Sequence, residues 1–260
     1  MSLALIQKLN EMLLAEMPEY RRQAAEVAED AAAQRSLLRA LMNVRPPLPL
    51  TEEFVRLQDE LLVAEREKRG AVDLMALPSV SLDARIILWQ GDITRLNTDA
   101  IVNAANSALL GCFIPCHRCI DNAIHSAAGL QLRAECAALM ERQGHSEETG
   151  TAKITQGYNL PARHVIHTVG PIVSGALTDE HRELLASCYR SCLHLAAEHG
   201  LRSIVFCCIS TGEFHFPNKE AAAIAVHEVC AFLGTSTSIE RVVFNVFKDE
   251  DRMIYERLLS

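Results

Sequence analysis

The sequence lacks both long apolar runs and an excess of positive charge. A membrane-spanning helix needs about eighteen uninterrupted apolar residues, and no run approaches that length. The segment 1–16 already mixes charges into its apolar pattern, so we expect neither a signal peptide nor a membrane span. The 25 Lys and Arg are outnumbered by 33 Asp and Glu, which gives a formal net charge of −8. Because a general nucleic-acid binder has the opposite balance, this function class is not expected either.

The cysteines also lack the dense spacing of a small disulfide-rich domain. Nine is an odd number, and the nine are scattered over a chain of 260 residues. This distribution favours reduced thiols and a cytoplasmic protein. No internal repeat or low-complexity tract interrupts the sequence, and 49% of its residues are apolar. The chain can therefore bury a large core.

Two patterns divide the chain into the segments 1–80 and 81–260. In the first, leucines recur at helical spacing up to about residue 69, and prolines at 46, 47 and 49 end one helical stretch. Thr51 followed by two glutamates is typical of the start of another helix. We predict an α-helical extension with no chemistry of its own. Its apolar stripes favour packing over one face of the sheet, and binding of a partner is the alternative.

In the second segment, short apolar strands alternate with longer amphipathic stretches. Strands are expected at 86–89, 100–102, 165–167, 204–206 and 242–244, and helices at 120–143, 180–199, 219–233 and 249–259. This alternation predicts an α/β layer sandwich with a mixed or parallel sheet. Ligands of such sheets bind beyond the carboxyl ends of strands. The polar segment that begins at Asn103 follows a strand and is expected there.

The densest group of reactive side chains lies between residues 111 and 122. Cys112, His117 and Cys119 offer thiolates and an imidazole, the ligands that zinc prefers, and three such ligands leave a fourth position for water or substrate. Cys116 is adjacent to His117, which makes simultaneous ligation harder, so we rank it below the other three. A closed zinc knuckle that includes Cys116 and a nucleophilic Cys–His pair are the alternatives.

Three further groups of polar residues are candidates for ligand binding. Asp92 follows a strand and a tight turn, where its carboxylate could accept a hydrogen bond from an adenine amine or merely end the strand. Asn103 and Asn106 could bind ribose hydroxyls or only form turns. The loop Ser210-Thr211-Gly212-Glu213-Phe214 could present N–H groups to a phosphate, with Phe214 as an aromatic wall, or simply connect a strand to a helix.

Asp121 is the acidic residue closest to the cysteine segment. It lies at the start of a predicted helix, where it could orient a water molecule or only cap the helix. Because the helix dipole stabilises a carboxylate at this end, we expect no raised pKa unless a metal changes its surroundings. His125, one turn further along, is expected to be a hydrogen-bonded histidine of the core.

Taken together, residues 82–259 resemble the macrodomain family, and within it the zinc-dependent macrodomains. The resemblance rests on these motifs in this order: Gly91-Asp92-Ile93-Thr94, Val102-Asn103-Ala104-Ala105-Asn106, Ile120-Asp121-Asn122-Ala123-Ile124-His125, Thr149-Gly150-Thr151-Ala152, His167-Thr168-Val169-Gly170-Pro171 and Ile209-Ser210-Thr211-Gly212. The segment from Gly111 to Cys119 stands where ordinary members have a glycine-rich loop. Glu213 and His215 replace the small apolar and glycine residues that are more usual in the last motif.

The resemblance implies a three-layer α/β/α macrodomain with a mixed central sheet and an ADP-ribose pocket. Asp92 would accept the adenine amine and Ile93 would contribute its backbone, while Asn103 and Asn106 would lie by the distal ribose. The diphosphate would be held by the loop Ser210, Thr211, Gly212, Glu213 and Phe214. One Zn²⁺ would be bound by Cys112, His117 and Cys119. Asp121 and Asn106 would be the catalytic residues.

The activity implied is zinc-dependent removal of mono-ADP-ribose from modified protein side chains, by cleavage at C1 of the distal ribose. An ADP-ribose reader without turnover and an O-acetyl-ADP-ribose deacetylase are the alternatives. The resemblance also implies a sirtuin-like ADP-ribosyltransferase and a lipoyl-carrier protein as partners.

Overall fold

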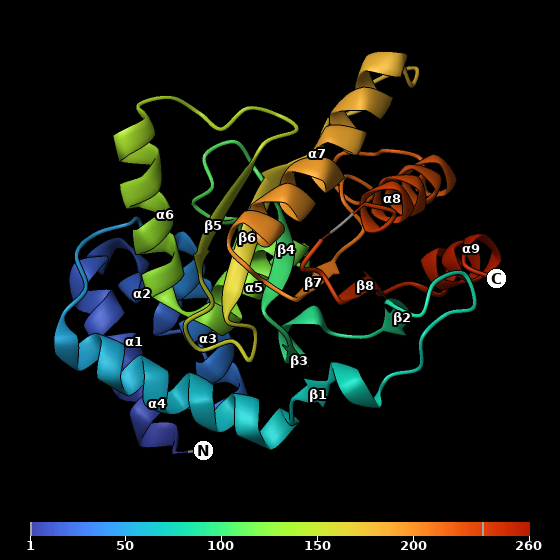
Figure 1. The fold of residues 1–260 in the computed structure, drawn as a ribbon. Helices are drawn as coiled ribbons and strands as arrows, with labels where there is room; N and C mark the ends of the chain where they lie inside the picture. Colours follow the sequence, from blue (N-terminus) through green and yellow to red (C-terminus); the bar gives the residue numbers. More distant parts are fainter. Residues whose placement is uncertain (1, 236) are drawn as a thin grey trace.

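The computed structural model describes residues 2–235 and 237–260, and its first part is helical as predicted (Figure 1). The helices of this part are α1 (Leu3–Glu16), the 3₁₀ turn η1 (Pro18–Tyr20), α2 (Arg21–Ala24), α3 (Ala31–Val44) and α4 (Glu52–Arg69). The Asp30 carboxylate caps α3 by accepting from two backbone N–H groups, and the Thr51 hydroxyl caps α4. The prolines after Val44 separate these two helices.

The second part alternates strands and helices along the chain. Its strands are β1 (Val72–Asp73), β2 (Ile86–Gln90), β3 (Leu96–Asn97), β4 (Ala100–Ala105), β5 (Ala152–Gln156), β6 (His164–Val169), β7 (Ser203–Phe206) and β8 (Arg241–Val246). Its helices are η2 (Leu74–Ala76), η3 (Ile93–Arg95), α5 (Ile120–Ala128), α6 (Leu130–Gln143), α7 (Asp179–Glu198), α8 (Asn218–Leu233) and α9 (Asp249–Leu258). All five predicted strands and the predicted helices after residue 179 are present.

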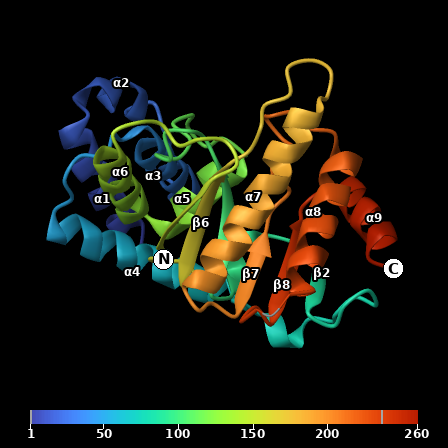
Figure 2. The same ribbon diagram turned by 45° about the horizontal axis from the view of Figure 1, so that its top comes forward.

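The central sheet has the strand order β2-β8-β7-β4-β6-β5. All neighbours pair in parallel except β5 and β6, which are antiparallel, so the sheet is mixed. Helices α7, α8 and α9 cover one face, and α5 and α6 pack against β4 and β5 on the other (Figures 1 and 2). The predicted three-layer α/β/α arrangement with a helical extension is confirmed. Strand β5 was not predicted, because only one of its five residues is buried.

The predicted single helix 120–143 is wrong. The chain breaks at Gly129, which has φ +99°, and forms α5 and α6 instead. A side chain at this position would also lie 2.6 Å from the Gln58 amide nitrogen. The Gln58 side chain of α4 accepts a hydrogen bond from the N–H of Leu130, the first residue of α6. A contact from the extension thus fixes the new helix start, and no local pattern reveals it.

The extension packs through its apolar stripes, as predicted, but against helices and not against the sheet. Its buried side chains form a cluster of their own, which Leu130 of α6 joins: Ile6, Leu9, Leu13, Met17, Leu38, Leu41, Met42, Phe54, Leu61 and Leu62. Helix α3 also contacts α5 directly. Residues 72–80 hydrogen-bond to the α/β part, because β1 pairs with β3 and Ser79 bridges to Ile87. Through α3, the extension therefore packs next to the segment that joins β4 to α5.

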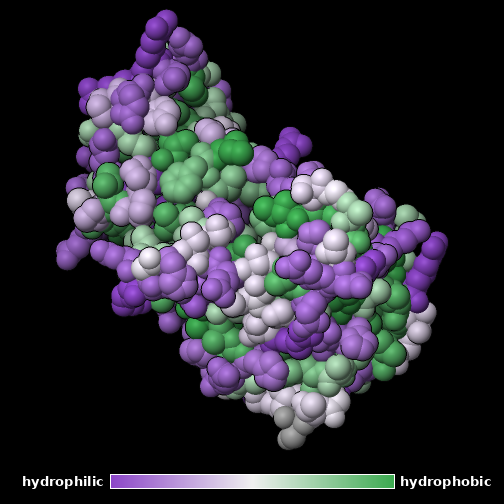
Figure 3. Space-filling model, turned by 90° about the horizontal axis from the view of Figure 1, so that it is seen from above, coloured by the Kyte–Doolittle hydropathy of each residue, from purple (hydrophilic) through white to green (hydrophobic). Residues whose placement is uncertain are grey.

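Within the described residues, no helix is both long and apolar enough to cross a membrane. Large apolar side chains do reach the surface at several places, among them Ile114, Ile172 and Phe247. On the face drawn in Figure 3, apolar and polar side chains are intermixed. Surface of this kind is normal for a folded domain.

Candidate active site

Cys112, His117 and Cys119 come together on the loop between β4 and α5. Their donor atoms all lie within 4.8 Å of one another, and Cys112 Sγ is 3.6 Å from His117 Nδ1. In tetrahedral zinc sites a bound sulfur and nitrogen are about 3.5 Å apart, given Zn–S and Zn–N bonds of about 2.3 and 2.0 Å. The donor set therefore fits Zn²⁺ both in chemistry and in spacing. Cys116 lies apart from this group, with its thiol 3.5 Å from the Ser36 carbonyl oxygen.

Both ends of the donor group are anchored to neighbouring elements. Cys119 is the N-cap of α5, and its Sγ accepts a hydrogen bond of 3.3 Å from the Asn122 N–H. His117 directs Nδ1 towards Cys112, while its Nε2 lies 3.6 Å from Glu213 Oε1 in the loop after β7. Metal-binding histidines commonly face a carboxylate with their second nitrogen. Glu213 therefore lies next to the group formed by Cys112, His117 and Cys119, called the metal-type group below. It also belongs to the predicted phosphate loop.

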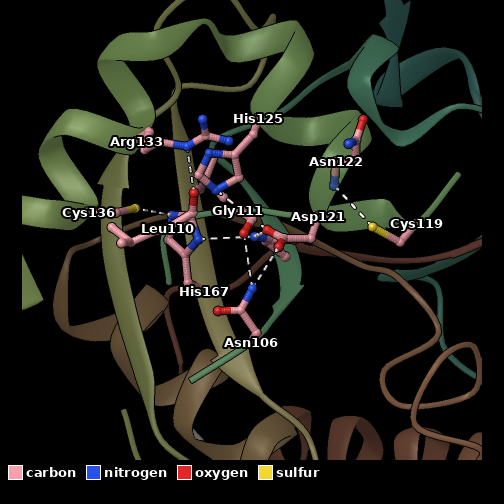
Figure 4. A network of polar contacts seen from close by, with 12 residues as sticks. Asn106, Leu110, Gly111, Cys119, Asp121, Asn122, His125, Arg133, Cys136 and His167 are labelled. Carbon is pink, nitrogen blue, oxygen red and sulfur yellow. Dashed lines mark hydrogen bonds and ion pairs between the residues drawn. The ribbon is translucent and has the colours of Figure 1, made fainter. Parts of the chain in front are cut away.

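Asp121 lies in the first turn of α5 and is buried, with 5% of its surface exposed. Its Oδ1 accepts a 2.8 Å hydrogen bond from Asn103 Nδ2, and its Oδ2 is 3.5 Å from Asn106 Nδ2 (Figure 4). The Asn106 amide also donates to the Gly111 carbonyl oxygen, at 3.1 Å. Asn106 therefore joins the start of the cysteine loop to the acidic residue. Asp121, Asn106 and the metal-type group form one site.

The expectation that the pKa of Asp121 is not raised was wrong. Burial raises the pKa of its carboxyl to about 6, and the hydrogen bond from Asn103 and the positive charge of Arg133 only partly offset this effect. The helix dipole acts over a short range, whereas removal from water affects the whole group. Sequence position alone gives no measure of burial.

Asn103, which we expected beside the ribose, is fully buried within β4. Its amide nitrogen lies 2.8 Å from Asp121 Oδ1 and 3.2 Å from His167 Nδ1. It can donate to both, which assigns the His167 proton to Nε2, 3.0 Å from the Thr155 hydroxyl oxygen. Its Oδ1 has no hydrogen-bond partner among the described residues.

A second group of possible ligands, His125, Cys136 and His167, lies beneath the first and is completely buried. Both nitrogens of His167 are already engaged, by Asn103 and by Thr155. His125 is buried as predicted, but neither of its ring nitrogens has a hydrogen-bond partner among the described residues. Burial lowers the pKa of both histidines, that of His167 to about 4. Both histidines are therefore uncharged near neutral pH, and they lie beside the buried Asp121.

The predicted adenine end of the pocket is formed by the turn after β2. Asp92 caps η3: its Oδ1 accepts from the Thr94 N–H at 3.0 Å and from the Thr94 hydroxyl at 2.7 Å. Its Oδ2 lies 3.3 Å from the Arg69 guanidinium at the end of α4. Ile93 is buried. The extension thus reaches this end of the site too.

The loop after β7 forms a closed turn. The Phe216 N–H donates to the Ser210 carbonyl oxygen, and the Thr211 hydroxyl donates to that of Cys208. Ser210 has φ +63° and is buried, and its hydroxyl has no partner among the described residues. The Phe214 carbonyl accepts from the Val173 N–H, which joins this loop to the one after β6. Gly212 is open on its side-chain face. The loop can offer N–H groups and a hydroxyl to an anion.

Comparison with known proteins identifies the family. The family model described as Macro domain matches residues 102–225. A Treponema medium protein named Protein-ADP-ribose hydrolase is 51% identical over 254 residues, which cover 97% of both chains. The chain belongs to the macro domain family. This macrodomain also resembles the solved Trypanosoma brucei macrodomain in complex with ADP-ribose, with a TM-score of 0.67 at 32% identity, over 85% of this chain and 95% of that one.

A longer fungal protein is related as well. The Fusarium oxysporum f. sp. cubense protein named "Probable bifunctional ADP-ribose hydrolase/ADP-ribosyltransferase" is 44% identical over 249 residues. The match covers 89% of this macrodomain but only 42% of the fungal protein.

Sequence reasoning missed four residues that hold the site together: Arg39, Asn43, Asn122 and Arg133. Asn122 and Arg39 are hydrogen-bonded although they are 83 positions apart in the sequence. Arg133 is buried on α6 and donates to the Leu110 carbonyl oxygen at the start of the cysteine loop (Figure 4). The only available signal was Asn122, which lies in a motif of this macrodomain family.

Proposed function

We propose that this protein is a zinc-dependent hydrolase that removes mono-ADP-ribose from modified protein side chains, cleaving the bond at C1 of the distal ribose. The observation that carries the proposal is the position of a buried carboxylate, Asp121, beside Asn106 and two residues after the zinc-type donor Cys119. The name of the Treponema relative and the ligand of the Trypanosoma structure support the reaction and the pocket.

ADP-ribose would extend from the turn after β2 to the cysteine loop. Asp92 would accept the adenine amine, and the neighbouring Ile93 would contribute its backbone. The loop Ser210, Thr211, Gly212, Glu213 and Phe214 would hold the diphosphate. Support for this placement is the Ser210 hydroxyl, which is buried and has no hydrogen-bond partner among the described residues.

In this mechanism the two oxygens of Asp121 have different tasks. Asn103 holds Oδ1, so Oδ2, which faces the Asn106 amide, is the oxygen left to orient the attacking water and accept its proton. Asn106 would fix the ribose and the water relative to each other, which contributes positioning. Bound to Cys112, His117 and Cys119, Zn²⁺ would supply Lewis-acid stabilisation at the distal ribose. Burial of Asp121 and His125 would keep other water away from the carboxylate.

An ADP-ribosyltransferase is the partner that must supply such a substrate. The Fusarium relative, whose name combines both activities, supports a functional pairing of hydrolase and transferase. A sirtuin-like transferase and a lipoyl-carrier protein as the modified target rest on the family resemblance alone.

The test is an ADP-ribose release assay on the purified protein, joined to metal analysis. Replacement of Cys112, His117 or Cys119 with Ala should abolish release of ADP-ribose, and so should removal of the metal by a chelator. Added zinc should restore release in the chelator-treated wild type but not in the variants. Full activity in verified metal-free protein would overturn the zinc role. An Asp121→Ala variant with unchanged turnover would remove that carboxylate from the mechanism.

The same preparation separates the alternative functions. Tight binding of ADP-ribose without release from any modified protein would identify a reader. Release from O-acetyl-ADP-ribose, with modified proteins untouched, would identify a deacetylase.

A further inference from the structure

We propose that the helical extension is part of the metal site, because Arg39 and Asn43 of α3 position the loop 111–119 that carries the three zinc-type donors. The inference rests on the proposed zinc site and assigns a function to the extension. Loop 111–119 contains no helix or strand, and one backbone hydrogen bond lies within it, from the His117 N–H to the Ile114 carbonyl oxygen at 3.2 Å. We infer that contacts from outside the loop position the rest of it.

Arg39 makes the most direct of these contacts. Its Nη2 donates to the carbonyl oxygen of His117, one of the three donor residues, at 3.2 Å. The same Nη2 and the Nε donate to Asn122 Oδ1, at 2.7 and 3.3 Å. The planar guanidinium therefore holds the backbone of a metal-type donor and the first turn of α5 in one geometry.

Asn122, which accepts the hydrogen bonds of Arg39, also contacts two further positions of the loop. It is fully buried, its N–H donates to Cys119 Sγ at 3.3 Å, and its Nδ2 donates to the Ile114 carbonyl oxygen at 3.1 Å (Figure 4). One asparagine thus links Arg39 to the sulfur of a second donor and to the middle of the loop. Hydrogen bonds of this kind orient metal ligands and tune their affinity.

Asn43, one helical turn after Arg39, contacts the loop at the turn 114–117. Its Oδ1 accepts a 2.9 Å hydrogen bond from the N–H of Cys116, a non-glycine residue at φ +53°. A backbone of this conformation is unfavourable for a side chain bigger than glycine and persists only where neighbours enforce it. Asn43 Nδ2 is fixed in turn by the Ser126 hydroxyl of α5, at 3.0 Å.

Arg133 makes a third connection, between the end of α3 and the start of the loop. Its Nη1 donates to the carbonyl oxygens of Met42 and Arg45, at 2.8 and 2.6 Å, and its Nε donates to that of Leu110, at 2.7 Å. The extension is therefore bound to the loop at its beginning, its bend and its donor end. A loop that these contacts already hold loses less conformational entropy when a metal binds.

The experiment compares two arginines of the same helix in the full-length protein. Arg39→Ala removes the contacts to the loop. Arg35→Ala is the matched control, because Arg35 forms a bidentate pair with Glu65 inside the extension, at 2.6 and 2.9 Å. Zinc affinity is measured by competition with a chromogenic chelator. We expect Arg39→Ala to bind zinc roughly 10- to 100-fold more weakly and Arg35→Ala to match the wild type. Equal affinities of the two variants would overturn the proposal.

A second variant guards against a folding defect. Arg39→Lys keeps the charge but reaches only one of the two acceptors, so an intermediate zinc affinity is expected. If Arg39→Lys binds zinc as weakly as Arg39→Ala, the contacts of the guanidinium to both His117 and Asn122 are needed. Wild-type zinc affinity in both Arg39→Lys and Arg39→Ala would contradict the proposal.

The effect of Arg39 on the order of loop 111–119 can also be measured in metal-free protein. Arg118 is an exposed trypsin site within the loop, and metal-free Arg39→Ala should be cut there faster than the wild type or Arg35→Ala. Equal cleavage rates of the wild type, Arg39→Ala and Arg35→Ala would refute the proposal that Arg39 orders the loop. If the wild type itself binds no zinc, the zinc part of the proposed function fails, while this cleavage comparison still decides whether the extension orders the loop.

Discussion

Replacing Asn103 with Leu is the perturbation that most directly tests how the carboxylate of Asp121 is held. Leucine has the same branched shape and the same number of side-chain heavy atoms as asparagine, but it has bulkier methyl groups in place of the amide. Asn103 is fully buried in β4, so solvent cannot take over its role without a rearrangement. The substitution would leave Asp121 Oδ1 and His167 Nδ1 without the donor they share.

The magnitude follows from the two contacts. A hydrogen bond to a charged group contributes about 1.5–3 kcal/mol, and one between neutral groups about 1 kcal/mol. With contacts of 2.8 and 3.2 Å, we expect Asn103→Leu to lower the free energy of unfolding by about 2 to 4 kcal/mol. If the contact to Asp121 is also needed in the transition state, its loss reduces kcat roughly 10- to 150-fold.

The assay combines urea unfolding with ADP-ribose release at saturating substrate. Thr155→Val is the matched control, since it removes the 3.0 Å contact to His167 Nε2 but leaves the contact between Asn103 and Asp121 in place. We expect this control to lose stability while it keeps most of its kcat. Wild-type stability and kcat in Asn103→Leu would refute the reasoning, as would equal losses of kcat in both variants.

Two further predictions concern the phosphate loop and the deeper histidines. A Cβ added at Gly170 would lie 2.0 Å from Ser210 Oγ and 2.9 Å from Ile209 Cγ2, so Gly170→Ala should distort the loop and weaken ADP-ribose binding about tenfold or more by calorimetry. Gly175→Ala, where a Cβ meets nothing within 4 Å, should bind like the wild type, and equal affinities for the two variants would count against the loop. Because burial lowers the pKa of His167 to about 4, the unfolded state binds the extra proton between pH 6.5 and 4. The stability contribution is complete above pH 6.5 and is lost as the pH falls, by about 3 kcal/mol in all. His167→Gln should flatten this slope in urea unfolding curves and the exposed His145→Gln should not, and an unchanged slope in His167→Gln would contradict the assignment.

Local patterns were sufficient for most elements of the fold. The apolar runs around Ile101 and Val205 predicted buried parallel strands, because such strands are covered on both faces. The pattern around Thr51 predicted a helix start, because capping depends only on neighbouring residues. Strand β5 at the edge of the sheet lacked this signal, since most of its residues are only partly buried. The break at Gly129 was missed because glycine alone does not reveal that Gln58 contacts it.

For the site, residue chemistry and spacing already selected Cys112, His117 and Cys119, and the structure brings their donor atoms together. Burial was not predictable in the same way. It places the Asn103 amide against Asp121, a contact that the sequence did not reveal, and it raises the pKa of that carboxyl. Burial depends on what lies above and below an element, which no short motif records.

By itself, the sequence determined which donor atoms exist and in what order the strands and helices follow, because these depend on residue type and on local periodicity. Only the tertiary structure decided which distant groups meet. Arg39 contacts His117 across 78 positions, and Glu213 contacts the same histidine from the loop after β7. Such contacts arise when the extension packs on α5 and when parallel strands bring their carboxyl ends to one edge of the sheet. The physical reason is that a side chain's partners are fixed by packing across the whole chain, whereas its chemistry is fixed by its own atoms.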